Sequence, residues 1–89
     1  MSEIIKAAAA GTLESSDAYV EIKPGKALEI EIDSVVMERF GEAIKKTVEE
    51  ELSLLKVENA SVFVSDRGAL DCVIRARIET AVKRAGEAK

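Results

Sequence analysis

Three segments of the chain alternate between apolar and polar residues, which is the pattern of a half-buried β-strand. They cover residues 18–23, 28–33 and 60–65. The turn residues Pro-Gly-Lys at 24–26 separate the first two, so the pattern predicts that these two strands form a hairpin. The residues expected to face the core are Ala18, Val20 and Ile22 in the first strand and Ala60, Val62 and Val64 in the third.

Two longer segments repeat apolar residues at helical spacing. They predict amphipathic helices over about residues 35–55 and 70–84. Asp33 or Ser34 is expected to accept a hydrogen bond from the first free backbone amides of the first helix. The charged residues opposite the apolar stripes are expected to face water. The stripes consist of Val36, Phe40, Ile44, Val48, Leu52 and Leu55 in the first helix, and of Leu70, Ile74, Ile78, Ala81 and Ala85 in the second.

The order strand, strand, helix, strand, helix predicts an α+β fold. We expect a two-layer sandwich, in which a small, mainly antiparallel sheet carries both helices on one face. A further strand around residues 12–15 is left open. The whole chain, 1–89, is expected to form a single domain, with residues 1–10 and 86–89 as flexible tails.

Composition removes several classes of function. The sequence has no histidine, so the usual general base at neutral pH and a common metal ligand are missing, and no metal is expected. The net charge is -4 and the longest basic cluster is the pair Lys45-Lys46, which argues against nucleic-acid binding. No segment approaches the roughly 20 apolar residues of a membrane helix. The single cysteine, Cys72, is expected to be a small packing residue and indicates a reducing, cytoplasmic location.

The segment from Gly11 to Asp17 reads Gly-Thr-Leu-Glu-Ser-Ser-Asp and places two adjacent hydroxyls between two carboxylates. A polar segment of this kind, next to a glycine, offers a hydroxyl that another enzyme can reach. The heptapeptide resembles the modification site of the acyl carrier (gamma) subunit of citrate lyase. Residues 68–77, which read Gly-Ala-Leu-Asp-Cys-Val-Ile-Arg-Ala-Arg, resemble a second stretch of the same subunit. With Phe40-Gly41, the resemblance covers most of residues 9–85.

The resemblance implies a non-catalytic carrier whose modified residue is Ser15, the serine directly after Leu-Glu. In that family a dedicated transferase, holo-citrate lyase synthase, joins this hydroxyl through a phosphodiester to phosphoribosyl dephospho-coenzyme A. The resulting arm ends in a thiol. The implied partners are the alpha subunit, which exchanges acetyl for citryl on the arm, and the beta subunit, which cleaves citryl to oxaloacetate and regenerates the acetyl form. Ser16 is the alternative attachment point.

Three other functions stay open at this point. The first is a malonate decarboxylase carrier with the same arm, and the second is an α+β interaction module without any modification. The third is a small enzyme in which Glu14 and Asp17 act as a pair of acids. In a carrier, these two carboxylates are either docking charges or residues that cap and solubilise a turn.

Three charged residues of the second predicted helix also need a role. Asp71 and Arg75 lie one helical turn apart and are expected to pair. Arg77 lies beside the apolar stripe, so its stem is expected to cover the core and its guanidinium to reach an edge. The small residues Ala69, Cys72 and Ala76 lie on another face, which either packs against the first helix, meets solvent or docks a subunit.

Overall fold

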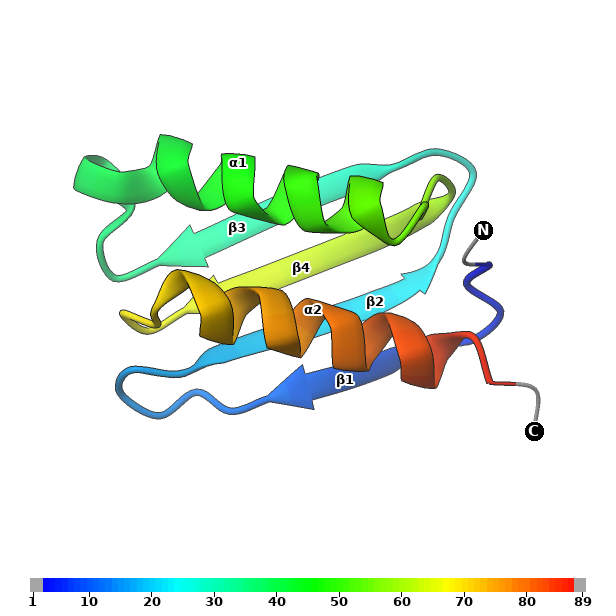
Figure 1. Ribbon diagram of the computed structural model, residues 1–89, viewed down its shortest axis with the longest axis horizontal. Helices are drawn as coiled ribbons and strands as arrows, with labels where there is room; N and C mark the ends of the chain where they lie inside the picture. Colours follow the sequence, from blue (N-terminus) through cyan, green and yellow to red (C-terminus); the bar gives the residue numbers. More distant parts are fainter. Residues whose placement is uncertain (1–2, 88–89) are drawn as a thin grey trace.

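The computed structural model describes residues 3–87, and within them the chain forms four strands and two helices. The elements follow in the order β1 (Ala8–Gly11), β2 (Ala18–Pro24), β3 (Glu29–Ser34), α1 (Met37–Leu54), β4 (Ala60–Asp66) and α2 (Asp71–Ala85). The strands form one sheet in the order β1-β2-β4-β3, and both helices lie over the same face of it (Figure 1). The predicted two-layer α+β sandwich is confirmed.

The strand that lies between β2 and β3 is β4, so the predicted hairpin of β2 and β3 is wrong. β4 pairs antiparallel with β2 and parallel with β3. The chain passes from β3 to β4 through α1, which supplies the crossover that parallel neighbours require. With β1 antiparallel to β2, the sheet is mainly antiparallel as expected. Alternation shows which face of a strand is buried, but it does not show which strand lies beside it.

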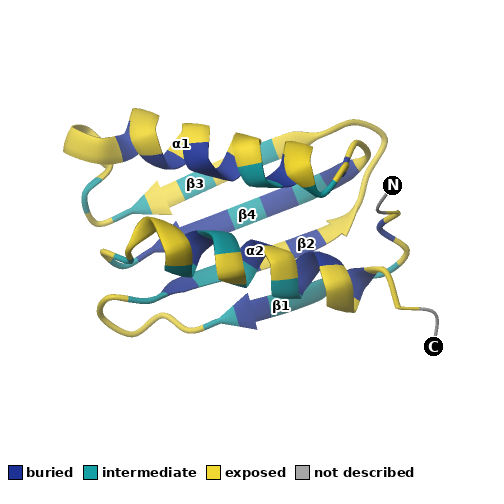
Figure 2. Ribbon diagram, in the orientation of Figure 1, coloured by how far each residue is buried: buried dark blue, intermediate teal, exposed yellow. Residues whose placement is uncertain are grey.

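The core lies between the sheet and the helices. Ala60, Val62 and Val64 of the central strand β4 are at most 1% exposed, and Figure 2 shows the buried stripes on the helix faces that meet the sheet. At the edge of the sheet, β3 alternates between half-buried isoleucines and exposed acids, which suits a strand with one unpaired side. The other fully buried apolar positions among residues 3–87 are Ala18, Val20, Ile22, Val48, Leu52, Ile78, Ala81 and Ala85.

The N-terminal segment is ordered, and the expectation of a flexible tail over residues 1–10 is wrong for most of it. Residues 8–11 form β1, and Ile4 is 8% exposed in the core. The N–H groups of Ile5 and Lys6 donate to the carbonyl of Ala85 at 3.0 and 3.2 Å, which satisfies one of the free carbonyls at the end of α2. The first strand is therefore at 8–11 and not at 12–15, which forms a loop. Residues 1, 2, 88 and 89 of the predicted tails lie outside the described residues.

Both helices start one or two residues later than the pattern predicts, at Met37 and Asp71, and one apolar residue near each start is exposed. The hydroxyl of Ser34 accepts a hydrogen bond from the N–H of Val36 at 3.0 Å, but Val36 is the residue before α1, and no side chain among the described residues caps the first amides of the helix, so the predicted cap by Asp33 or Ser34 is wrong. Phe40 is 50% exposed and Leu70 is 71% exposed, so their assignment to buried stripes is wrong. Phe40 lines an open groove between the starts of the two helices, and Leu70, the residue before α2, lines it too.

Candidate functional site

Residues 12–17 connect β1 to β2, and we call them the Ser15 loop. The loop lies at the end of the molecule where β4 leads into α2 (Figure 1). The N–H of Asp17 donates to the carbonyl of Glu14 at 3.1 Å and closes a turn with the two serines at its centre. Ser16 has a φ of 68°, the positive value that the third residue of a type II turn requires. Both serines are exposed, so the hydroxyl of Ser15 is open to another protein.

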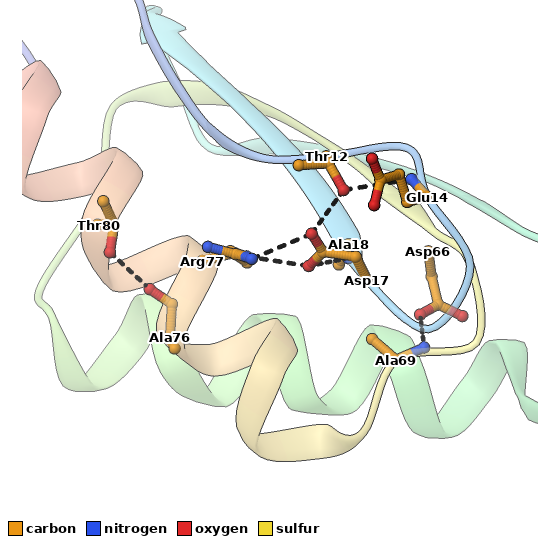
Figure 3. Close-up of polar contacts among 9 residues, drawn as sticks. All are labelled: Thr12, Glu14, Asp17, Ala18, Asp66, Ala69, Ala76, Arg77 and Thr80. Carbon is orange, nitrogen blue, oxygen red and sulfur yellow. Dashed lines mark hydrogen bonds and ion pairs between the residues drawn. The ribbon is translucent and has the colours of Figure 1, made fainter.

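The carboxylate of Asp17 holds this turn in place. Figure 3 shows the side chain of Arg77, from α2, reaching the carboxylate, where its Nε and Nη2 donate to Oδ1 and Oδ2, each at 3.0 Å. Thr12 donates to Oδ2 at 2.6 Å, and the N–H of Ala18 donates to Oδ1 at 2.7 Å. The carboxylate of Asp17 therefore joins both ends of the loop to Arg77, which lies 60 positions away in the sequence. A two-bond contact between a guanidinium and a carboxylate fixes the relative orientation of the two side chains as well as the distance between them.

These contacts stabilise the ionised form of Asp17. Hydrogen bonds from Arg77, then from Thr12 and the Ala18 amide, hold the pKa of the Asp17 carboxyl far below its ordinary value. Asp17 is consequently a loop-holding residue, which favours the turn-structuring interpretation over a docking charge. Glu14 differs, because its side chain is exposed and its backbone N–H donates to the hydroxyl of Thr12 at 3.2 Å.

A second anchor comes from the connection between β4 and α2. The N–H of Ser16 donates to the carbonyl of Arg67 at 2.8 Å, and the N–H of Arg67 donates to the carbonyl of Asp17 at 3.0 Å. These bonds continue the pairing of β2 with β4 past the end of the sheet. The buried Asp66 fixes the connection in turn, since its carboxylate accepts bonds from Ser34 and from the N–H of Ala69. The Ser15 turn is thus braced from two neighbouring elements.

A glycine permits the close approach at the start of the loop. Gly11 has a φ of 93°, and a Cβ there would lie 1.9 Å from the carbonyl oxygen of Ala18. Only a residue without a side chain lets β1 turn into the loop at this distance from β2. Gly11, the first residue of the heptapeptide, therefore has a structural role in placing the turn.

An apolar groove of about 390 Å³ lies next to the same end of the molecule. It runs between the starts of α1 and α2 and includes Gly68, Ala69 and Leu70 of the connection that anchors the Ser15 loop. Its walls include the exposed side chains of Phe40 and Leu70.

Asp71 and Arg75 join the two helices. The predicted pair is confirmed, with Arg75 Nε 2.9 Å from Asp71 Oδ2, and Arg75 also contacts Glu50 and Glu51 of α1. The hydroxyl of Thr47 donates to the other carboxylate oxygen of Asp71. This bond and the one from Arg75 lower the pKa of Asp71. These residues are occupied with packing α2 against α1.

Other candidate chemistry is sparse in the described residues. Cys72 is exposed on α2, so its expected packing role is wrong, and it lies on a face that meets solvent. Between residues 3 and 87, no three His, Cys, Asp or Glu side chains gather in a group that could hold a metal ion. No helix in that range is long and apolar enough to cross a membrane.

Local sequence patterns make Ser15 a candidate attachment point, but they do not indicate the residues that hold its turn. In the sequence, Arg67 is only part of a loop and Thr12 only part of the motif. The contact between Arg77 and Asp17 joins residues 60 positions apart, and one sequence carries no signal for such a pair. The guanidinium of Arg77 was expected to reach an edge. It extends from α2 to Asp17, the residue directly before β2.

The known proteins similar to this chain include small acyl carriers. A family model described as the malonate decarboxylase delta subunit matches residues 5–85. Citrate lyase acyl carrier protein of Treponema denticola is 49% identical over 85 residues, which cover 96% of this chain and 98% of the relative. The protein of the same name from Haemophilus influenzae strain PittEE is 53% identical, over 93% of this chain and 87% of the relative.

A solved structure supports the fold. A chain of a malonate decarboxylase hetero-tetramer from Pseudomonas superposes with a TM-score of 0.82, covering 93% of this chain and 87% of that one at 22% identity. The sequence matches define the class as acyl carrier proteins, which are subunits without catalysis of their own. Within that class, the chain belongs to the citrate lyase acyl carrier protein family.

Proposed function

We propose that this chain is the acyl carrier subunit of citrate lyase and that the hydroxyl of Ser15 is the attachment point of phosphoribosyl dephospho-coenzyme A. The supporting observation is the position of Ser15, exposed at the centre of a turn whose ends are fixed by Asp17, Arg77 and Arg67. When bound, the arm supplies a thiol that carries acetyl and citryl groups as thioesters.

The residues present fit such a group. The hydroxyl is exposed and the turn is narrow, so a transferase can reach Ser15 without opening the core. Ser16 is a poorer attachment point, because its N–H is tied to Arg67 and its backbone has a positive φ that disfavours rearrangement. The two serines therefore differ in the freedom of their backbones, although both side chains are exposed.

The chain's own contribution is to hold the attachment point at a fixed place. A tethered group reaches its partner sites at a high effective concentration, and this advantage depends on a tether whose origin does not move. The fork between Arg77 and Asp17 supplies that fixed origin by joining the loop to α2. We propose the alpha and beta subunits of citrate lyase as the partners, in a cytoplasmic complex, and holo-citrate lyase synthase as the modifying enzyme.

Intact-mass measurement after co-expression with this transferase tests the attachment. The wild-type chain is expected to gain the mass of the arm, and peptide mapping across residues 7–23 is expected to place it on Ser15. Ser15→Ala should keep its unmodified mass. Ser16→Gly is the matched control, since glycine suits the positive φ and removes only the neighbouring hydroxyl. An arm on Ser15→Ala, or none on the wild type, would overturn the proposal.

A malonate decarboxylase carrier is the second candidate, favoured by the description of the matching family model. The relatives that are about half identical to this chain are named for citrate lyase, whereas the malonate decarboxylase structure is 22% identical and supports the fold alone. Mixing the modified chain with the subunits of each complex separates the two. Citrate cleavage, and no malonate decarboxylation, is the expected result.

A further inference from the structure

Arg67 is a cationic residue whose backbone adjoins the Ser15 turn and whose guanidinium makes none of the contacts described above. The backbone of Arg67 lies directly against the turn, bonded to the N–H of Ser16 at 2.8 Å and to the carbonyl of Asp17 at 3.0 Å. Its Nε is buried and finds no hydrogen-bond partner among residues 3–87. A buried donor without a partner is costly and uncommon in a folded protein, so this one calls for a reason.

If the turn is modified, the charges around Ser15 explain why the Nε–H of Arg67 lacks a partner in the unmodified chain. The proposed phosphodiester adds a negative charge between Glu14 and Asp17, where two carboxylates already lie. Arg77 already pairs with a carboxylate, because its Nε and Nη2 both donate to Asp17. Arg67, in contrast, has a charge of the right sign and an unused Nε–H, on a residue whose backbone bonds to Ser16 and Asp17 of the same turn.

We infer that Arg67 binds the phosphate that joins the prosthetic group to Ser15 and thereby sets the direction in which the arm leaves the turn. This inference rests on the proposed function. Arginine suits the task, since its planar fork donates to two phosphate oxygens at once and stays charged at every physiological pH. Because Nε is shielded in the unmodified chain, the guanidinium turns toward Ser15 on modification and its unpartnered donor gains an acceptor.

The two arginines near the turn then have different roles. Arg77 holds the carboxylate of Asp17 and fixes the backbone. Arg67 holds the phosphate and fixes the first bonds of the arm. Arg67 is a binding residue for the prosthetic group and takes no part in acyl transfer.

Nuclear magnetic resonance of the unmodified and modified wild-type chains tests the inference. Intact mass first establishes that the arm is present, which tests the proposed function separately. In the modified chain, the Nε–H resonance of Arg67 is expected to shift downfield and to exchange more slowly with water. The Nε–H resonance of Arg84, at the far end of α2, is the internal control and should stay where it is.

Variants give a second readout on the phosphorus nucleus. Arg67→Gln should shift the ³¹P resonance of the phosphodiester toward that of a free peptide phosphodiester, and Arg67→Lys should do so in part. Lys83→Gln, which removes one exposed positive charge near the end of α2, is the matched control and should leave the resonance unchanged. Circular dichroism confirms that each variant is folded.

The outcomes separate the two proposals. A chain that carries the arm on Ser15 but shows the same Arg67 Nε–H resonance as the unmodified chain would overturn the inference and leave the proposed function standing. Identical ³¹P spectra from Arg67→Gln and Lys83→Gln would likewise overturn the inference alone. A chain that acquires no arm refutes both.

Discussion

Replacing Gly11 by alanine perturbs the point where β1 turns into the Ser15 loop. The φ of 93° is unfavourable for any residue with a Cβ, at a cost of about 1–2 kcal/mol. The new Cβ would also lie 1.9 Å from the carbonyl oxygen of Ala18, so the backbone must shift. Overpacking of this kind adds about 1–3 kcal/mol. We therefore expect Gly11→Ala to lower the free energy of unfolding by about 2–5 kcal/mol, the sum of the two costs.

Gly68→Ala is the matched control for this change. Gly68 has a similar φ of 87°, but a Cβ there meets no atom within 4 Å. Only the backbone cost of about 1–2 kcal/mol should remain. Urea denaturation of the wild-type chain and the two variants measures the difference. Equal destabilisation by the two substitutions would refute the claim that the close approach of Gly11 to Ala18 shapes the loop.

Three further predictions concern the loop, the core and the surface. Because hydrogen bonds from Arg77 and Thr12 lower the pKa of Asp17, the folded chain gains stability above the unfolded pKa of about 3.9 and loses it as the pH falls below that value. Asp17→Asn should lack this acid-dependent loss in a denaturation series, and an unchanged acid profile would contradict it. Ile78→Ala, in the core, should cost about 2–5 kcal/mol, whereas Leu70→Ala, at 71% exposure, should stay within about 0.5 kcal/mol. Cys72 should react with a maleimide in the folded chain, and protection until unfolding would show it to be covered.

The elements of the fold were predictable because hydrophobic periodicity depends on neighbours along the chain. The strands over 18–23 and 60–65 and the two helices follow from it. β1 was not predictable in this way, since three of its four residues are alanines and carry no alternation. The order of strands also lay beyond the sequence. β4 lies between β2 and β3 because of the tertiary packing of α1. The alternation of residues within each strand gives no information about that packing.

The candidate site also contains one residue that a local pattern indicates and others that it does not. Ser15 is a candidate from a heptapeptide alone, because a motif of this kind is a local property of the sequence. The residues that hold it, Arg67 and Arg77, come from distant segments that only the fold brings together. Phe40 and Leu70 show the opposite error, since helical spacing assigned them to the core although no part of the chain between residues 3 and 87 fully covers them.

Reconstitution of citrate cleavage from separate subunits tests the central claim most directly. Each carrier variant is first treated with the transferase and then mixed with the alpha and beta subunits, and oxaloacetate formation is measured. We predict activity for the wild-type chain and for Ser16→Gly, and none for Ser15→Ala. Citrate cleavage restored by folded Ser15→Ala would contradict the account, because that variant lacks only the oxygen that we propose as the attachment point.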